Sequence, residues 1–262
     1  MLPPIDVQRL TTALPTSQGW GAVVHREVTG STNADVLERA VPWSPVLADL
    51  QTAGRGRLGR AWQEVPGAGL AMSVLVPTVP APGWLPLAAG LAVRSALTEV
   101  GVAAELKWPN DVLVPADGDR KVCGVLCQML PSGTGVVVGI GINVHHERDQ
   151  LPVATATSLR LVGAQVDRTD LAASVLRGLR GLHADLAAGD ERAKGVHLAY
   201  REACGTIGRL VDVHRPDGSV VTATATGVDD DGRLVVSADG RSDTVAAGDV
   251  QHIRPAGTSP RP

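Results

Sequence analysis

The sequence predicts an α+β fold in which a mixed β-sheet is flanked by helices and followed by a small C-terminal β-barrel. Three features of the chain lead to this prediction. Short β-rich runs alternate with turns through residues 23–143, and residues 84–100 and 169–204 carry apolar side chains at helical spacing. From residue 206 onward, five short runs are separated by Asp/Gly turns, which is typical of a small barrel.

The first strands of the sheet are expected at residues 23–28, 46–50 and 70–76. Between the first two runs, Ser31 or Thr32 can cap a helix that continues to Ala40. This segment has two interpretations. It is a simple helix cap, or its hydroxyls and the free N–H groups beside them also hold a small polar ligand.

Residues 84–100 form a helix in this interpretation, because their apolar positions fall on one side and pack against the sheet. Residues 105–143 resemble a three-strand meander, with strands at 106–114, 121–126 and 136–143. Pro109 marks a bulge or break in the first of them, since proline cannot donate a backbone hydrogen bond.

Two further helices are expected after the meander, a long one capped by Thr169 or Asp170 and a second over residues 191–204. The barrel strands are expected at 209–214, 219–227, 233–236, 243–246 and 250–254. The chain then divides into a larger domain at 1–204, a barrel at 205–255 and a disordered tail at 256–262.

Composition excludes several classes of protein. The 262 residues carry a net charge of -3, which does not indicate a nucleic-acid-coating surface. No apolar run approaches membrane-spanning length, and the first residues lack the pattern of a signal peptide. The three cysteines show no paired metal spacing and are interpreted as buried reduced thiols. We therefore expect a cytoplasmic protein.

Residues 51–62 form the most distinctive stretch, because glycines and arginines alternate in it. The residues concerned are Gly54, Arg55, Gly56, Arg57, Gly59 and Arg60. Glycine allows close approach of backbone to a ligand, and arginine supplies donors that fit carboxylate and phosphate oxygens. The stretch is either a clamp that closes over an anion or a solvated basic loop of the kind that RNA-binding tails contain. The acidic balance of the chain favours a discrete anionic ligand.

Charged side chains also interrupt the apolar runs of the meander. Lys107 and Asp111 flank Trp108-Pro109-Asn110, and Lys121 opens the next strand. Such residues form a structural ion pair or face a site. Lys121 alone would be a solvated strand end, but the combination favours a site.

Five motifs in order resemble the biotin protein ligase family over residues 25–145. They are Ser31-Thr32-Asn33, the Gly/Arg stretch from Gln51 to Arg60, Lys107-Trp108-Pro109-Asn110-Asp111, Lys121-Val122-Cys123-Gly124 and Gly139-Ile140-Gly141-Ile142-Asn143. The resemblance implies a catalytic domain like those of biotin ligases and class II aminoacyl-tRNA synthetases, followed by an SH3-like barrel. It also implies a two-step reaction: biotin, ATP and Mg2+ give biotinyl-5'-AMP, and biotin then passes to a lysine of a carboxylase carrier domain.

The resemblance assigns candidate site residues. For biotin they are Ser31, Thr32, Asn33, Gln51, Gly54, Arg55, Arg57, Trp62, Lys121 and Gly124. For the nucleotide they are Arg57, Arg60, Lys107, Asn110, Lys121 and Asn143. Arg57 and Lys121 would neutralise the two anions that meet in the first step. Asp111 either orients and deprotonates the carrier lysine or merely pairs with Lys107. No residues are assigned to a metal.

Two departures from the family pattern matter. Leu58 stands where many relatives have a basic or polar residue, so one loop contact is expected to be missing. About thirty residues precede Ser31, too few for a winged helix-turn-helix, so we expect no DNA binding and no repressor activity. A monomer or weak homodimer is expected.

Three alternatives compete with this assignment. Lipoate ligase is the nearest competing enzyme, and an RNA-binding module is the competing non-enzyme. A dinucleotide-binding interpretation of Gly139-Ile140-Gly141 fails because no third glycine or helix follows, and no P-loop pattern is present.

Overall fold

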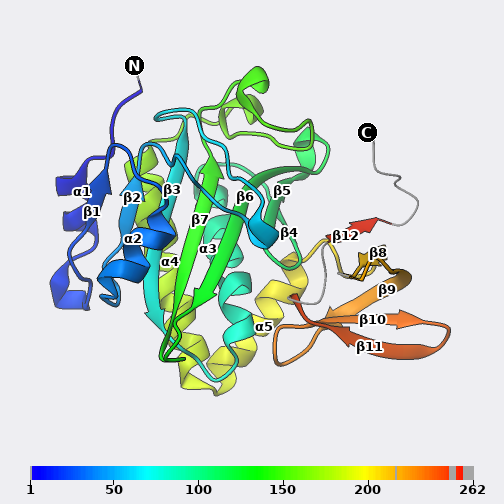
Figure 1. Cartoon of the computed structure of the whole chain (residues 1–262). Helices are drawn as coiled ribbons and strands as arrows, with labels where there is room; N and C mark the ends of the chain where they lie inside the picture. The colour runs from blue at the N-terminus through cyan, green and yellow to red at the C-terminus, as the bar shows by residue number, and fades with distance from the viewer. Residues whose placement is uncertain (1, 216, 248–251, 256–262) are drawn as a thin grey trace.

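The computed structural model describes residues 2–215, 217–247 and 252–255, the last of these as backbone only. Figure 1 shows a larger part built around one sheet and a smaller part formed by the last strands of the chain. The large sheet has seven strands in the order β1-β2-β3-β7-β6-β5-β4. Strands β1 and β2 pair in parallel and all other neighbours are antiparallel, so the prediction of a mixed sheet is confirmed.

The strands of this sheet are β1 (Val24–Arg26), β2 (Val46–Ala48), β3 (Gly69–Pro77), β4 (Glu105–Lys107), β5 (Asp111–Val114), β6 (Arg120–Met129) and β7 (Gly135–Asn143). The prediction of a three-strand meander over residues 105–143 was wrong, because four strands occupy it. The expected break at Pro109 is a complete turn that separates β4 from β5.

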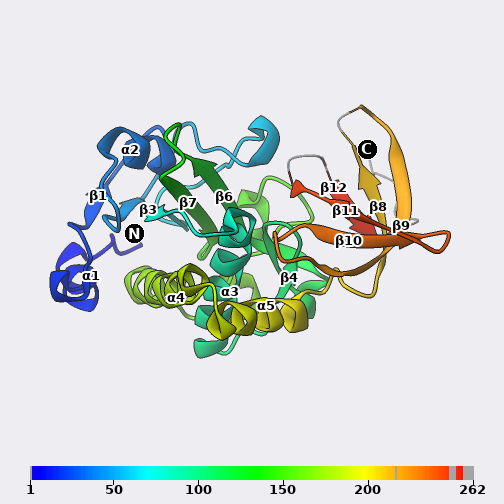
Figure 2. The same ribbon diagram turned by 90° about the horizontal axis from the view of Figure 1, so that it is seen from below.

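Helices cover both faces of the sheet: α1 (Val7–Ala13), α2 (Thr32–Arg39), α3 (Leu85–Glu99), α4 (Arg168–Ala188) and α5 (Glu191–Ala203). Figure 2 shows α3, α4 and α5 on one face and α2 on the other. The cap of α4 was predicted wrongly. Asp167 caps it, because its carboxylate accepts the backbone N–H groups of Thr169 and Asp170, the two residues that were expected to do so. None of the helices in the described part of the chain is long and apolar enough to cross a bilayer.

Helix α1 was not predicted, although its signals are present in the sequence. The Asp6 side chain accepts the N–H of Arg9, and Leu10 and Leu14 are fully buried one turn apart. The helix packs beside α4, where Arg9 pairs with Asp167.

The two faces of β7 differ in what covers them. Ile140 and Ile142 belong to the main core beneath α3, whereas Val137 belongs to a small apolar cluster under α2. Because side chains alternate along a strand, Gly139 and Gly141 lie on the α2 side with Val137. The α2 face of the sheet is therefore bare backbone at its centre.

The C-terminal sheet has five antiparallel strands: β8 (Leu210–His214), β9 (Val220–Val228), β10 (Leu234–Ala238), β11 (Arg241–Val245) and β12 (His252–Pro255). Its order is β11-β10-β9-β8-β12. The SH3-like barrel stays a prediction, because the described strands pair as an open ladder. We propose residues 204 and 205 as the domain boundary. The tail predicted at 256–262 lies outside the described residues.

The turn between β9 and β10 packs into the larger domain. The indole N–H of Trp84 donates to the Asp230 carbonyl and that of Trp108 donates to the Gly232 carbonyl, each at 3.0 Å. Gly83 lies so close to the turn that a side chain there would overlap the Asp231 carbonyl oxygen. The C-terminal sheet is thus anchored on two buried tryptophans of the larger domain.

Candidate active site

The site begins as a floor of backbone on the α2 face of the sheet. Gly124 of β6 and Gly141 of β7 are register partners. A Cβ on Gly141 would lie 2.6 Å from the Trp62 ring, and one on Gly139 would overlap the Asn33 amide. The side chains above these glycines therefore rest directly on the strands.

A β-bulge directs Lys121 toward this floor. Side-chain alternation alone would put Lys121 and Gly124 on opposite faces, since three positions separate them. The pairing of β5 with β6 shifts register between Val112 and Leu113, which leaves Val122 as an extra residue on β6. Lys121 consequently lies above the floor, with its Nζ 2.8 Å from where a Gly124 Cβ would stand.

Lys121 forms an ion pair with Asp111, with 2.5 Å between Nζ and a carboxylate oxygen. Lys107 is the Cα partner of Asp111 on β4, so both predicted roles of Asp111, as a base and as a partner of Lys107, stay predictions. The Lys121 ammonium also lies 5.7 Å from the centroid of the Trp62 ring. A cation, an anion and an aromatic ring thus meet at one end of the floor.

The Gly/Arg stretch folds into a short hairpin. The N–H of Trp62 donates to the Gly54 carbonyl and the N–H of Gly56 donates to the Arg60 carbonyl, at 2.9 and 2.7 Å. A 3-10 turn at Arg57–Gly59 forms the tip, where Leu58 is exposed and has a left-handed φ of 57°.

Arg57 is the arginine of this hairpin that is partly buried, whereas Arg55 and Arg60 are exposed. Burial lowers the pKa of the Arg57 guanidinium, and the Asp111 carboxylate opposes that shift. Arg57 also donates to the backbone carbonyl of Ala247 in the C-terminal domain. The hairpin therefore places one cation near the Lys121–Asp111 pair.

A chain of polar groups lines the other end of the floor. The side-chain oxygen of Gln51 accepts from the Thr32 backbone N–H at 2.9 Å, and the Thr32 hydroxyl lies 2.7 Å from that of Ser73. The Ser73 hydroxyl donates to Asn33 at 2.6 Å, and the Asn33 amide donates to Gln128 at 2.6 Å. These bonds fix the orientations of Thr32 and Gln51. They also engage both ends of the Asn33 amide, so this residue holds its neighbours in place.

Ser31 stands at the N-cap position of α2, yet its hydroxyl makes no capping hydrogen bond. The Ser31 hydroxyl thus makes no bond to the helix, whereas the first N–H of α2, that of Thr32, donates to Gln51. The Ser31 side chain therefore does not cap the helix, and ligand binding by this segment stays a prediction.

The two asparagines predicted for the nucleotide are both bonded to backbone. The Asn110 amide donates to the Val125 carbonyl at 2.8 Å, and the buried Asn143 amide donates to the Thr157 carbonyl at 2.9 Å. Nucleotide binding by these residues stays a prediction, as does binding by Lys107 and Arg60.

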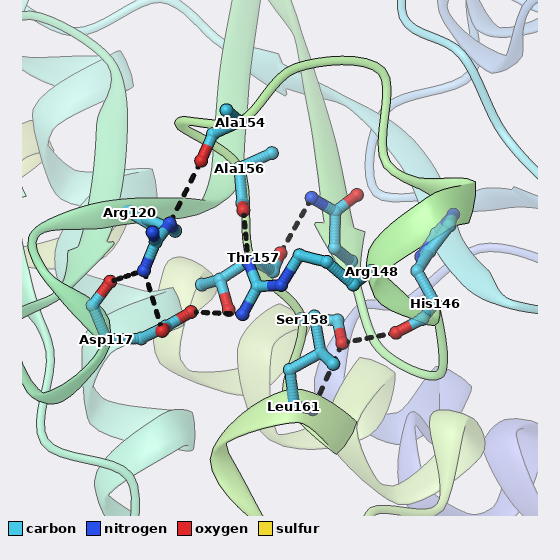
Figure 3. Close-up of polar contacts among 10 residues, drawn as sticks. Asp117, Arg120, His146, Arg148, Ala154, Ala156, Thr157, Ser158 and Leu161 are labelled. Atoms are coloured by element: carbon cyan, nitrogen blue, oxygen red, sulfur yellow. Dashed lines mark hydrogen bonds and ion pairs between the residues drawn. The ribbon is translucent and has the colours of Figure 1, made fainter.

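A segment of irregular backbone, residues 153–157, holds Lys121 from outside the sheet. The Lys121 N–H donates to the Thr155 carbonyl and its carbonyl accepts the Thr157 N–H, both at 2.8 Å. Figure 3 shows how this segment is fixed. The Asp117 carboxylate accepts hydrogen bonds from both Arg120 and Arg148. Arg120 also donates to the Ala154 carbonyl, and Arg148 donates to the Ala156 carbonyl. The backbone of Lys121 is therefore braced on both sides.

Several residues of the site were not predicted from sequence. Ser73, Gln128 and Glu64 all bond to predicted residues. Ser73 interrupts an apolar strand and could have been noticed for that reason. Nothing in the sequence around Gln128 or Glu64 distinguishes them from solvated polar residues.

The described residues give no sign of a resident metal site, since no group of three His, Cys, Asp or Glu side chains among them is arranged to hold one. The three cysteines are free, and burial raises the pKa of the Cys127 thiol to about 12. The Cys127 thiol therefore stays protonated and unreactive at neutral pH.

Two cationic side chains at one end of a glycine floor and an ordered polar cluster at the other define a site for an elongated ligand with a polar head and an anionic tail. The model of the biotin/lipoate A/B protein ligase family matches residues 23–145, and that of the biotin protein ligase C-terminal domain matches residues 206–253. The chain belongs to the biotin protein ligase family.

Individual relatives agree with this assignment. The biotin--[acetyl-CoA-carboxylase] ligase of Mycobacterium tuberculosis is 37% identical over 96% of this chain and 97% of that protein. The bifunctional ligase/repressor BirA of Bacillus subtilis is 30% identical over 82% of this chain and 69% of that protein. The biotin protein ligase of Aquifex aeolicus, solved in complex with biotin and ATP, superposes with a TM-score of 0.78 at 26% identity, covering 89% and 99% of the two chains.

Proposed function

We propose that this protein activates biotin with ATP to biotinyl-5'-AMP and transfers the biotin to one lysine of a carboxylase carrier domain. The match to the biotin ligase C-terminal domain and the Mycobacterium tuberculosis relative support this activity over lipoate ligation. The observation that carries the proposal is the position of Lys121. A bulge places its ammonium above the glycine floor, 2.5 Å from Asp111.

The polar end of the floor suits the ureido ring of biotin, which offers two N–H donors and one carbonyl. The Gln51 amide, held by Thr32, and the free Ser31 hydroxyl supply both acceptors and donors. The valeryl chain of biotin would then run along the floor beside Trp62 toward Lys121. Its carboxylate would end at the cationic side of the site.

The first step joins two anions. A carboxylate oxygen of biotin attacks the α-phosphorus of ATP, and the bond from that phosphorus to the pyrophosphate oxygen breaks. Two unit charges 4 Å apart repel by about 4 kcal/mol at an effective dielectric constant near 20. Lys121 and Arg57 offset this repulsion, since both are cationic and lie beside Asp111 at the same end of the floor.

In the second step, the amine of the carrier lysine attacks the acyl carbon and AMP leaves. The amine must lose a proton, and Asp111 is the carboxylate positioned at this end of the site. Asp111 would exchange its contact with Lys121 for one with the incoming ammonium. Lys121 then stays with the phosphate.

Mg2+ enters as part of the MgATP substrate. The described residues offer no cluster of three ligating side chains, and Mg2+ usually keeps waters and phosphate oxygens as its ligands. When bound, it would neutralise the charge of the departing pyrophosphate. We further propose that the enzyme acts in the cytoplasm as a monomer or weak homodimer.

Incubation with ATP, labelled biotin and an apo carrier domain tests the proposed function. We expect the label on a single carrier lysine only when ATP is present. Labelled lipoate in place of biotin should give no product. Transfer of lipoate but not biotin, or of neither, would refute the proposed function.

A further inference from the structure

One carboxylate contacts both ends of the site and has no role in the chemistry above. Glu64 follows the Gly/Arg hairpin, and one of its oxygens accepts the backbone N–H of Gln51 at 2.8 Å. The other oxygen accepts the Trp62 indole N–H at 3.0 Å and lies 3.5 Å from the Gln51 side-chain nitrogen. Glu64 is thus bonded to the residue proposed for the biotin head and to the residue proposed for its chain.

The partly buried environment of Glu64 disfavours the charged form of its carboxyl group. Burial raises the pKa of its carboxyl group, and the donors from Gln51 and Trp62 oppose this shift together with the buried Arg168 of α4. A carboxylate taken out of water destabilises a fold unless its oxygens are hydrogen-bonded. Here the compensating hydrogen bonds come from Gln51 and Trp62, both on the walls of the ligand site, and Arg168 adds only a coulombic attraction.

The bonds to Glu64 remove a freedom that each partner would otherwise have. The Gln51 side-chain oxygen faces Thr32 and its nitrogen faces Glu64, so the amide cannot turn over. The Trp62 ring carries a single donor, and its bond to Glu64 fixes the rotation of the ring flat over Gly141. An amide held in one orientation and a ring held in one plane are preorganised partners for a rigid ligand.

We propose that Glu64 is a positioning residue for biotin, setting the Gln51 amide and the Trp62 ring together from a single carboxylate. This inference rests on the proposed function. Glu64 bonds to neither Lys121 nor Asp111 in the described structure, so its influence falls on binding of the vitamin and leaves the reacting atoms in place.

The test is steady-state carrier labelling with Glu64→Ala, Glu64→Gln, Trp62→Phe and the double variant Trp62→Phe/Glu64→Ala. Phenylalanine keeps the apolar wall but removes the indole donor. We expect Glu64→Ala to raise the KM for biotin about tenfold, since two hydrogen-bonded groups lose their partner, and to change kcat and the KM for ATP less than twofold. Trp62→Phe should raise the same KM by a smaller factor.

The remaining variants report on the mechanism. Glu64→Gln should be intermediate, because an amide oxygen can replace only one of the two acceptors. The double variant should be less impaired than the product of the single effects, since both changes remove one shared bond. Gln63→Ala is the matched control, since its exposed side chain lies next to Glu64 in sequence, and it should behave as the native chain.

The outcomes separate this inference from the proposed function. A native chain that labels no carrier refutes the function itself. A native chain that labels the carrier while Glu64→Ala leaves the KM for biotin unchanged overturns the inference alone. Equal rises in both KM values with a fall in kcat would show a general structural role and also overturn it. Glu64→Gln, which preserves volume, gives the same readout if Glu64→Ala fails to fold.

Discussion

The indole N–H of Trp108 donates a 3.0 Å hydrogen bond to the backbone carbonyl of Gly232, which lies 124 positions further along the chain. The Trp108 backbone N–H also donates to the Thr206 hydroxyl, at 3.1 Å. The turn that carries Asn110 and leads into Asp111 is thus supported by the C-terminal domain. The small sheet therefore helps to hold the proposed catalytic end of the larger one.

Replacing Trp108 by phenylalanine should destabilise the protein by about 1–3 kcal/mol, because the buried Gly232 carbonyl loses its donor. Denaturant unfolding measures this loss. Substituting Leu198, which is exposed on α5, by alanine is the control and should change stability by less than about 0.5 kcal/mol. Equal stability of Trp108→Phe and native protein would show that this contact does not join the domains.

Gly141→Ala should weaken biotin binding while the fold survives. The new Cβ would lie 2.6 Å from the Trp62 ring, so the ring must leave the floor at a cost of about 1–3 kcal/mol. Calorimetric titration with biotin measures the loss. Gly227→Ala in β9 is the matched control, since no atom lies within 4 Å of its Cβ position. Native affinity in Gly141→Ala would mean that the position of Trp62 is irrelevant to the vitamin.

Asp111→Asn should impair the second step more than the first. Transfer from preformed biotinyl-5'-AMP to the carrier should fall roughly hundredfold, because asparagine cannot accept the amine proton. Adenylate formation should fall less, since Lys121 remains in place. Separate single-turnover measurements of the two steps provide the comparison. Unchanged transfer in this variant would eliminate Asp111 as the base.

The loss of folding stability at acidic pH should depend on His146. Its side chain is almost fully buried, neither ring nitrogen has a hydrogen-bond partner among the described residues, and burial lowers its pKa to about 4. The unfolded chain takes up a proton near the ordinary value of 6.5, whereas the folded chain does so only near 4. Stability contributed by this difference is complete above pH 6.5 and is lost as the pH falls toward 4, by at most about 3 kcal/mol.

His146→Leu should therefore flatten the fall in unfolding free energy between pH 6.5 and 4. Unfolding in urea at a series of pH values shows the slope for both proteins. Burial also lowers the pKa of the half-buried His145, so His145→Leu should flatten the same slope to a smaller extent. An unchanged slope in His146→Leu would assign the acid sensitivity to other groups.

The candidate site residues that sequence alone could propose are those whose chemistry is local. The Gly/Arg stretch, the segment around Asp111 and the strand from Lys121 each combine residue types that have few other uses together. The geometry of Lys121 could not be predicted, because it depends on a bulge whose register is set by pairing with β5. Glu64 was missed for a related reason, since only the tertiary fold brings its carboxylate to Gln51.

The fold shows the same limit. Strands and helices with strong periodicity were predicted close to their bounds. The split into β4 and β5 depends on which backbone groups pair between strands. The cap at Asp167 likewise depends on which of several neighbouring polar side chains reaches the N–H groups at the start of α4. Helix α1 is short and derives its stability from packing on α4, so the pattern of its own residues was too weak to predict a helix.

The most direct test of the account is biotin-dependent exchange of labelled pyrophosphate into ATP, which isolates the first step. The native chain should exchange only when biotin is present, and Lys121→Met should lower the rate by roughly a hundredfold or more, because the cation between the two anions is lost. Lys194→Met, which removes an exposed ammonium paired with Glu191 on α5, should leave the rate unchanged. Native-like exchange by Lys121→Met, or exchange by the native chain without biotin, would contradict the account.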